Sequence, residues 1–203
     1  MTWALAAPGA VAAAYQAVAL AASLRQWIRR RGPAKRGIFR PPVSILKPVR
    51  GLDDRFEKCI RSHAVLDYPD YEVLFGVSDP NDPAVPVIER LESEHAHVRL
   101  AVCGSRAANG KVGVLTDLAR VARNPSLVVN DSDIEVDRNY LREVAAPLED
   151  ERVGMVTCLY RARALTWPGR LEALGIATDF APGVLAAPLF GVSGFALGST
   201  MAL

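Results

Sequence analysis

Five short apolar runs alternate with amphipathic segments from residue 43 onward, and this alternation restricts the fold more than any other feature of the sequence. The apolar runs have the length of buried strands and cover residues 43–49, 71–79, 98–104, 126–133 and 153–160. Between them, apolar residues recur with helical spacing over residues 52–66, 81–96, 111–122 and 138–148. Continuous apolar strands joined by helices of 10–15 residues are typical of βαβ units. The sequence therefore predicts an α/β domain with a mostly parallel sheet flanked by helices.

The pattern loosens after residue 160. Residues 164–191 are apolar and are interrupted by proline and glycine. This segment fits an interfacial helix pair or a lipid-facing lobe, and it equally fits an ordinary helix and loop that cover the sheet. Residues 193–203 are interpreted as a strand or hairpin.

The N-terminal segment lacks charge over residues 1–24 and is rich in Ala, Val and Leu. About 20 apolar residues are enough to cross a bilayer as a helix. Trp3 and Trp27 bracket the segment, and residues 25–36 then hold six cationic side chains and no acid. We interpret residues 1–27 as a transmembrane anchor, 28–42 as a basic linker and 43–203 as a globular domain on the cytoplasmic side. A cleaved signal or a buried helix is the alternative, although a signal peptide carries its positive charges before the apolar run.

The overall charge of +2 hides an asymmetry between the two ends of the chain. Residues 1–50 hold nine basic and no acidic side chains, whereas residues 51–203 hold fifteen basic and twenty-two acidic ones. An acidic globular part argues against nucleic-acid binding. Three widely separated cysteines indicate neither a zinc site nor a disulfide framework. The three histidines, His63, His95 and His97, lie in polar contexts and are predicted to be solvated.

Acidic residues follow two of the predicted strands. Asp79 ends the second strand, and Asp131 and Asp133 end the fourth. In α/β sheets, ligands gather beyond the carboxyl ends of the strands. If the strand continues, Asp131 and Asp133 point to the same side. Two carboxylates at one position form an oxygen site suited to Mg²⁺ or Mn²⁺, which takes further ligands from substrate phosphates.

Five motifs in order make the interpretation more specific. They are LKPVRGLD (46–53), DYPDYEVLFGVSDPNDPA (67–84), NGKVGVL (109–115), VVNDSDIEV (128–136) and VGMVTCLY (153–160). This set resembles the ceramide glucosyltransferase family, and most closely its bacterial branch associated with hopanoid lipids. The closing GSTMAL (198–203) is similar to a strand of the same family.

The resemblance implies an inverting GT-A glycosyltransferase of the bacterial inner membrane, with residues 43–203 as its catalytic domain, incomplete at the C-terminus. Such an enzyme moves glucose or N-acetylglucosamine from a UDP-sugar to a lipid hydroxyl, of ceramide or hopanoid type, with Mg²⁺ or Mn²⁺ as cofactor. By position, Asp79 corresponds to an acid near the nucleotide, and Asp131 with Asp133 to the metal-binding D-x-D. Lys111 corresponds to a lysine that meets a phosphate of the donor. Lys47, and Arg50 beside it, are similarly placed at the end of the first strand.

The family's catalytic base follows the strand that GSTMAL resembles, so we expect it beyond Leu203 and expect the chain to be truncated. Two alternatives remain open. In the first, the chain is a UDP-sugar-binding fragment without turnover. In the second, it is a metal-dependent nucleotidyltransferase that uses the same aspartates on a soluble substrate. The predicted membrane anchor argues against the second alternative.

Overall fold

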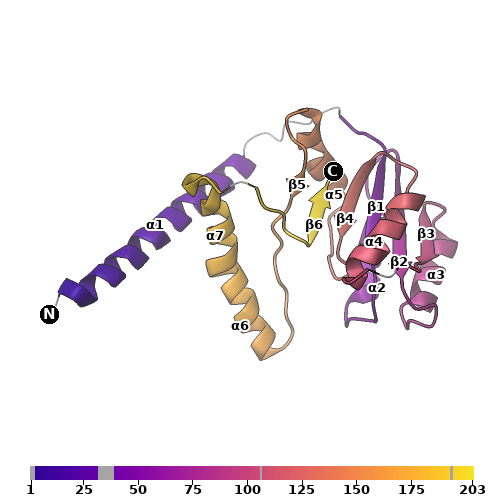
Figure 1. Ribbon diagram of the computed structural model, residues 1–203, viewed down its shortest axis with the longest axis horizontal. Helices are drawn as coiled ribbons and strands as arrows, with labels where there is room; N and C mark the ends of the chain where they lie inside the picture. The colour runs from indigo at the N-terminus through magenta and orange to yellow at the C-terminus, as the bar shows by residue number, and fades with distance from the viewer. Residues whose placement is uncertain (1–2, 32–38, 106, 193) are drawn as a thin grey trace. The chain divides into compact units, whose positions relative to one another are not determined.

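The predicted strands form a mixed sheet in the computed structural model, which describes residues 3–31, 39–105, 107–192 and 194–203 (Figure 1). Within these residues the sheet has six strands in the order β3-β2-β1-β4-β6-β5. Strands β1 to β4 are parallel, and β6 pairs antiparallel with both β4 and β5. The strands are β1 Val43–Pro48, β2 Tyr71–Val77, β3 Val98–Val102, β4 Ser126–Asn130, β5 Val156–Thr157 and β6 Thr200–Ala202. The prediction of a mostly parallel α/β sheet is confirmed.

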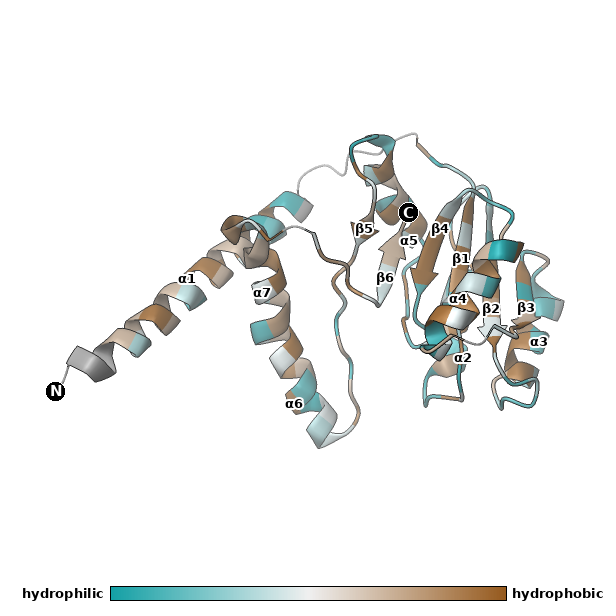
Figure 2. Cartoon of the chain, in the orientation of Figure 1, coloured by the Kyte–Doolittle hydropathy of each residue, from teal (hydrophilic) through white to brown (hydrophobic). Residues whose placement is uncertain are grey.

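Helices cover both faces of this sheet because its strands alternate two apolar sets of side chains. The helices are α2 Phe56–Ala64, α3 Val85–Glu94, α4 Gly110–Val121 and α5 Tyr140–Ala145, the last followed by a 3₁₀ turn, η1 Ala146–Glu149. Buried residues of α2, α3 and α5 cluster with Val43 and Ile45 of β1. The buried face of α4 clusters instead with Leu46 of β1 and Leu74 of β2. Figure 2 shows hydrophobic residues concentrated on the strands and hydrophilic residues on the outer helix surfaces.

Strand β5 is much shorter than predicted. It contains only Val156 and Thr157 of the expected run over residues 153–160. Its position explains the difference, because β5 lies at the edge of the sheet and pairs only with the three-residue β6. A strand with one short partner has few ladder hydrogen bonds to extend it. The apolar composition of residues 153–160 therefore predicted a longer strand than the pairing with β6 supports.

The chain divides into two compact units. One comprises Gly37–Cys158 and Ala196–Leu203, which hold the sheet, and the other comprises Met1–Arg36 and Leu159–Phe195. Residues 159–195 thus group with the N-terminal helix, whereas the sequence had assigned them to the predicted catalytic domain. Two predicted features lie at least partly outside the residues that the structure describes. They are the side chain of Trp3 and residues 32–38 of the basic linker.

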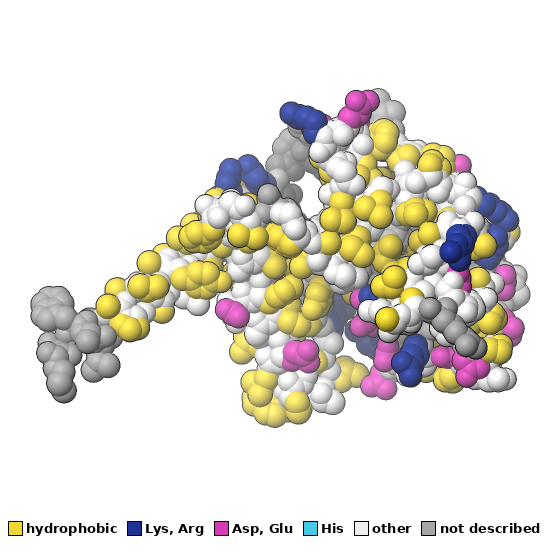
Figure 3. Space-filling model, in the orientation of Figure 1, with side chains coloured by type: hydrophobic (Ala, Val, Ile, Leu, Met, Phe, Trp, Pro, Cys, Tyr) yellow, Lys and Arg dark blue, Asp and Glu magenta, His cyan; other side chains and the backbone are white. Residues whose placement is uncertain are grey.

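The second unit pairs two long apolar helical segments. Helix α1 Trp3–Arg31 packs against α7 Ala181–Ala186, with the small side chains Ala19, Ala22 and Ala186 buried. Small residues allow helix backbones to approach closely. Two segments, Ala7–Arg29 and Trp167–Phe190, are long and apolar enough to cross a membrane by length and composition. Figure 3 shows hydrophobic side chains along the visible surface of α1. The sequence predicted only the first of these segments as a span.

Residues 167–190 form one continuous helical run and not a broken pair. The run comprises α6 Trp167–Gly175, a π-helical turn η2 Ile176–Phe180, α7, and a 3₁₀ turn η3 Ala187–Phe190. The amide of Ala181 donates to the carbonyl of Ile176, which is the wider π-helical spacing. Pro182 and Pro188 lie in the first turns of α7 and η3, where the hydrogen-bond spacing changes from π-helical to α-helical and from α-helical to 3₁₀. The prolines therefore do not break the helix, although their presence in the sequence suggested that they would.

Glu72 of β2 is a buried carboxylate that ties together the amino-terminal edge of the sheet, and it carries a prediction. Its Oε1 accepts from Ser44 Oγ and from the Arg123 amide, both at 2.6 Å, and its Oε2 accepts from Arg99 Nη2 at 2.8 Å. Burial alone would raise the pKa of Glu72, but these hydrogen bonds outweigh it, so the pKa lies below its ordinary value. A lowered pKa in the folded state contributes stability at neutral pH that is lost as the pH falls from about 4.3 through the folded value.

Glu72→Gln is therefore expected to lower the free energy of unfolding by about 1–2 kcal/mol at pH 7. The difference from the unaltered chain should shrink as the pH falls toward 3, because protonation removes the same charge. Thermal unfolding of the full chain in detergent, followed by near-ultraviolet circular dichroism across this range, measures both quantities. A difference that is constant between pH 7 and pH 3 contradicts the prediction.

Candidate functional site

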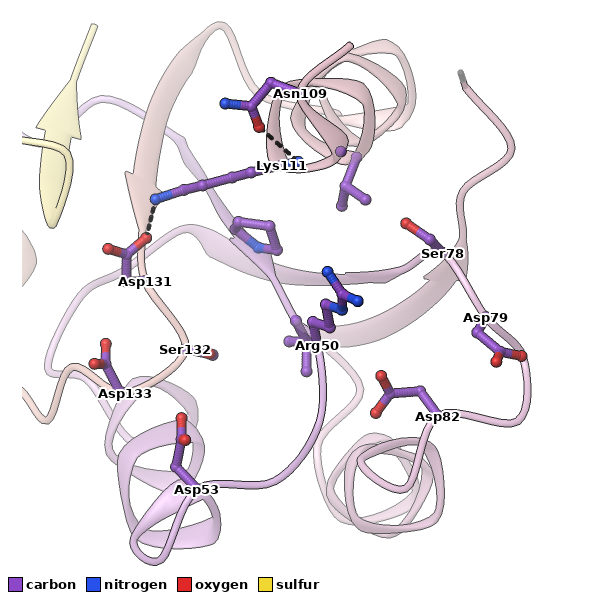
Figure 4. Close-up of a pocket in the computed structure, with 14 residues that line it drawn as sticks. Arg50, Asp53, Ser78, Asp79, Asp82, Asn109, Lys111, Asp131, Ser132 and Asp133 are labelled. Carbon is purple, nitrogen blue, oxygen red and sulfur yellow. Dashed lines mark hydrogen bonds and ion pairs between the residues drawn. The ribbon is translucent and has the colours of Figure 1, made fainter. Parts of the chain in front are cut away.

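A cavity of about 780 Å³ lies beyond the carboxyl ends of β1, β2 and β4 (Figure 4). The chain runs from β1 outward through β2 to β3 and then returns to place β4 on the opposite side of β1. Such a reversal separates the strand ends and opens a crevice, where ligands of open α/β sheets bind. The lining comprises Pro48, Val49, Arg50, Asp53, Ser78, Asp79, Asp82, Asn109, Gly110, Lys111, Val114, Asp131, Ser132 and Asp133.

The paired acids after β4 both face this cavity. Strand β4 ends at Asn130, and residues 131–133 form a turn in which the Ile134 amide donates to the Asp131 carbonyl at 3.3 Å. The argument from strand alternation is therefore wrong, because the acids lie beyond the strand. Asp131 and Asp133 nevertheless both line the cavity (Figure 4). The sequence thus predicted the correct placement for an incorrect geometric reason.

Lys111 enters the cavity from the start of α4. The side chain of Asn109 caps this helix by accepting from the amides of Lys111, at 3.0 Å, and Val112, at 3.4 Å. The Lys111 ammonium forms an ion pair with the Asp131 carboxylate, and both side chains are partly exposed. The structure therefore brings Lys111 and Asp131 together, as the sequence predicted for residues of one site.

Asp79 and Arg50 line the cavity beyond the ends of β2 and β1. Asp79 follows β2, and its Oδ1 accepts from the Asn81 amide at 2.8 Å. Arg50 follows β1, and Figure 4 shows its guanidinium directed into the cavity.

Asp82 also lines the cavity, although nothing in the sequence indicated this. Its carboxylate accepts from the Gly51 amide at 2.8 Å and from the Ala84 amide at 2.9 Å. Gly51 has φ +75°, a conformation that favours glycine. Asp82 thus fixes the turn that presents Arg50.

Lys47 does not reach the cavity, in contrast to the prediction that it binds the donor directly. Its side chain is fully buried on the α2 face of the sheet, and it is absent from the cavity lining. The ammonium donates to Asn130 Oδ1 at 2.5 Å, to the Asp131 carbonyl at 2.7 Å and to His63 Nε2 at 3.3 Å. Burial lowers the pKa of Lys47 to about 7. Alternation along β1 explains the error, because the side chain of Lys47 lies on the same face of the sheet as that of Ile45, which α2 covers.

His63 is buried as well, so the prediction that it is solvated is wrong. Its Nδ1 lies 3.0 Å from the Cys59 carbonyl, which can only accept, so Nδ1 carries the proton and Nε2 accepts from Lys47. Burial, and secondly the charge of Lys47, hold the pKa of His63 well below its ordinary value. The neutral imidazole is therefore a hydrogen-bonding member of the core. Helical spacing could have revealed this, since His63 lies three residues after Ile60 on the buried stripe of α2.

The donor set of the cavity fits Mg²⁺ or Mn²⁺ better than a metal that needs an all-protein site. Within the described part of the chain, no three histidine, cysteine, aspartate or glutamate side chains are grouped to hold a metal ion. Asp131 and Asp133 supply two carboxylates. Mg²⁺ is commonly held by one or two carboxylates, with water and substrate phosphates completing its coordination. A structural zinc site would require four ligands.

This mostly parallel α/β sheet, with an acidic turn beyond its fourth strand, has the GT-A fold. Comparison with known families then places the protein more narrowly. The chain belongs to glycosyl transferase family 21, whose sequence model matches residues 1–203. The resemblance inferred from the five motifs is thereby confirmed at the level of the family.

Individual relatives match only parts of the chain. Ceramide glucosyltransferase of Candida albicans is 31% identical over 77 residues, which cover 37% of this chain and 14% of that protein. Ceramide glucosyltransferase 3 of Caenorhabditis elegans is 30% identical over 121 residues, covering 58% of this chain and 26% of that protein. The chain therefore matches about a quarter or less of the length of these relatives.

A solved structure supports the fold. A mannosyltransferase from Pyrobaculum calidifontis, in complex with GDP-Man and Mn²⁺, matches 93% of this chain and 56% of its own, with a TM-score of 0.60. The sequences are 18% identical, so the similarity concerns the fold.

Proposed function

We propose that this chain forms the donor site of a membrane-bound glycosyltransferase, which moves glucose or N-acetylglucosamine from a UDP-sugar to a lipid hydroxyl. The observation that carries the proposal is the meeting of Asp131, Asp133 and Lys111 in one cavity beyond the parallel strands. An acid pair suits a divalent cation, and a lysine beside it suits a phosphate. The relatives named as ceramide glucosyltransferases support a lipid acceptor of ceramide type. A hopanoid-type acceptor is proposed from the sequence resemblance alone.

The roles of the cavity residues follow from their positions. Asp131 and Asp133 would hold Mg²⁺ or Mn²⁺, which when bound offsets the negative charge of the departing diphosphate. Lys111 and Arg50 supply two further positive charges to that diphosphate. Asp79, beyond the end of β2, is assigned to the nucleoside. Inversion is proposed from the family resemblance, with the acceptor hydroxyl displacing the diphosphate directly at the anomeric carbon. Holding donor and acceptor at fixed positions favours that displacement.

Membrane attachment is part of the same proposal. The two apolar segments, Ala7–Arg29 and Trp167–Phe190, support anchoring in a bilayer. The basic residues 25–36 favour the cytoplasmic face of a bacterial inner membrane, because cationic flanks remain on that side. A lipid acceptor in the membrane and a soluble nucleotide-sugar donor would then meet at one surface.

Calorimetric titration of the full chain in detergent tests the donor site. UDP is expected to bind at least about tenfold more tightly with Mn²⁺ than with EDTA, because one added contact between charged groups contributes about 1.5 kcal/mol or more, and more tightly than GDP. Equal affinity with Mn²⁺ and EDTA would refute the metal-dependent site. Transfer of labelled sugar to a lipid acceptor then distinguishes an active transferase from a fragment that only binds its donor. Pyrophosphate release from UTP and a sugar phosphate would instead indicate a nucleotidyltransferase.

Lys111→Met is expected to weaken UDP binding about tenfold, because a charge-assisted hydrogen bond contributes about 1.5 kcal/mol. The side chain is 43% exposed, so its loss should leave the free energy of unfolding nearly unchanged. Lys58→Met is the matched control, since Lys58 pairs with Glu135 and does not line the cavity. An equal loss of affinity in both variants would show that only net charge matters.

A further inference from the structure

The turn that carries the two cavity carboxylates is held from inside the protein as well as from the cavity side. The carbonyl of Asp131 accepts from Lys47 Nζ at 2.7 Å, and the carbonyl of Asp133 accepts from Cys59 Sγ at 3.1 Å. Lys47 comes from β1 and Cys59 from α2, on the same face of the sheet. Each acid is therefore fixed at its backbone by a group that does not itself line the cavity.

The hydrogen-bonding capacity of the protonated Lys47 side chain is fully used. All three of its N–H groups have an acceptor, and all three acceptors are uncharged. Taking an ammonium out of water costs several kcal/mol unless its hydrogen bonds are complete. Hydrophobic residues would fill the same space without that cost, so the position is poorly explained by packing alone.

The acceptors of Lys47 are themselves fixed in orientation. Asn130 is fully buried, and its Nδ2 donates to Thr200 Oγ1 at 2.9 Å and to Tyr140 Oη at 3.2 Å, which directs its Oδ1 to Lys47. His63 is held in one tautomer by the Cys59 carbonyl. The network thus joins β1, β4, β6, α2 and α5 directly behind the turn at residues 131–133.

We infer that Lys47 is a positioning residue: together with Cys59 it holds the backbone of residues 131–133 so that both carboxylates face the cavity in an arrangement ready for a divalent cation. The inference rests on the proposed function for its consequence, but the restraint on the turn stands independently of it. Groups that orient metal ligands from behind typically change metal affinity by 10- to 100-fold. Lys47 therefore acts through Asp131 and not through contact with the donor.

Lys47→Met tests the inference, because methionine has a similar length without donors. The variant is expected to weaken Mn²⁺-dependent UDP binding roughly 10- to 100-fold, while UDP affinity in EDTA stays unchanged. Ser44→Ala is the matched control. Ser44 is fully buried on the same strand, but its hydroxyl bonds Glu72 at the opposite end of the sheet. It should affect stability without changing Mn²⁺-dependent affinity by more than about twofold.

A second pair of variants separates the hydrogen bond from general packing. Cys59→Ala removes the donor to the Asp133 carbonyl, whereas Cys59→Ser keeps a donor. Alanine is expected to weaken Mn²⁺-dependent affinity about threefold, and serine to restore most of it, since a thiol is a weak donor. If Ser44→Ala weakens binding as much as Lys47→Met, or if Lys47→Met stays within twofold of the unaltered chain, the inference is overturned.

Hydrogen exchange distinguishes failure of this inference from failure of the proposed function. Lys47→Met should accelerate amide exchange in residues 131–136 at least about tenfold relative to residues 71–77 of β2. If the unaltered chain does not bind UDP with Mn²⁺, the proposed function falls, and the exchange result alone decides the positioning role. Unchanged exchange over residues 131–136 would then overturn it.

Discussion

Asp131→Asn is expected to reduce the Mn²⁺-dependent affinity for UDP by about 100-fold or more, because it removes one of the two carboxylates offered to the cation. Loss of a group that merely supports a metal ligand already costs 10- to 100-fold. Asparagine preserves the shape of the side chain, and the backbone contacts to Lys47 and to the Ile134 amide do not depend on the carboxylate. Calorimetry with and without Mn²⁺ measures the effect. UDP affinity in EDTA should change far less.

The ion pair with Lys111 requires a control for this variant. Asp131→Asn also frees the Lys111 ammonium, which could then move within the cavity. A double-mutant cycle with Lys111→Met measures that coupling. If Asp131 acts only by holding Lys111, the two single variants and the double variant will lose the same affinity. Asp137→Asn makes the same charge change outside the cavity lining and should leave binding intact. Full Mn²⁺-dependent binding by Asp131→Asn would contradict the assignment.

The main elements of the sheet unit were readable from the sequence because each depends on local pattern. Apolar runs gave β1 to β4, and helical stripes gave α2, α3 and α4, although most of the predicted segments were longer than the structure. The acids after β2 and β4 were recognisable because a charged residue directly after a buried run marks a strand end. These features need only the order of residues along the chain.

The buried network could not be read in the same way, since its partners are distant in sequence. Lys47 lies 83 residues from Asn130, and 16 from His63. A lysine at the end of a strand is ordinarily solvated, and nothing near it in the sequence indicates three acceptors. Only tertiary packing of β4 and α2 around β1 shows that this cation is internal. Its role as a positioning residue, and the metal-binding role of the acids, remain predictions.

Gly113→Ala carries the second large effect, because α4 both covers the sheet and presents Lys111 to the cavity. A Cβ at Gly113 would lie 2.8 Å from the carbonyl oxygen of Ser105, a backbone atom that a side-chain rotation cannot move. The Ser105 amide donates to Asp117 of α4 at 2.9 Å, so separating the loop from the helix also strains this contact. Overpacking of this kind costs about 3 kcal/mol at the upper end of its usual range.

The expected result is a free energy of unfolding lowered by about 2 kcal/mol in Gly113→Ala, because alanine's preference for a helix interior, roughly 0.5–1 kcal/mol, offsets part of the overpacking. Mn²⁺-dependent UDP binding should also weaken, because the start of α4 shifts. Gly110→Ala is the matched control for stability: it lies three residues earlier in the same helix, and a Cβ there would meet nothing within 4 Å. Gly110 is the first residue of α4, where alanine gains less over glycine than in a helix interior, so this variant should be about as stable as the unaltered chain. Chemical unfolding of both variants in detergent measures the difference. Equal stability of the two would mean that the loop at Ser105 yields without cost, and that α4 is not held against it as tightly as the close approach at Gly113 requires.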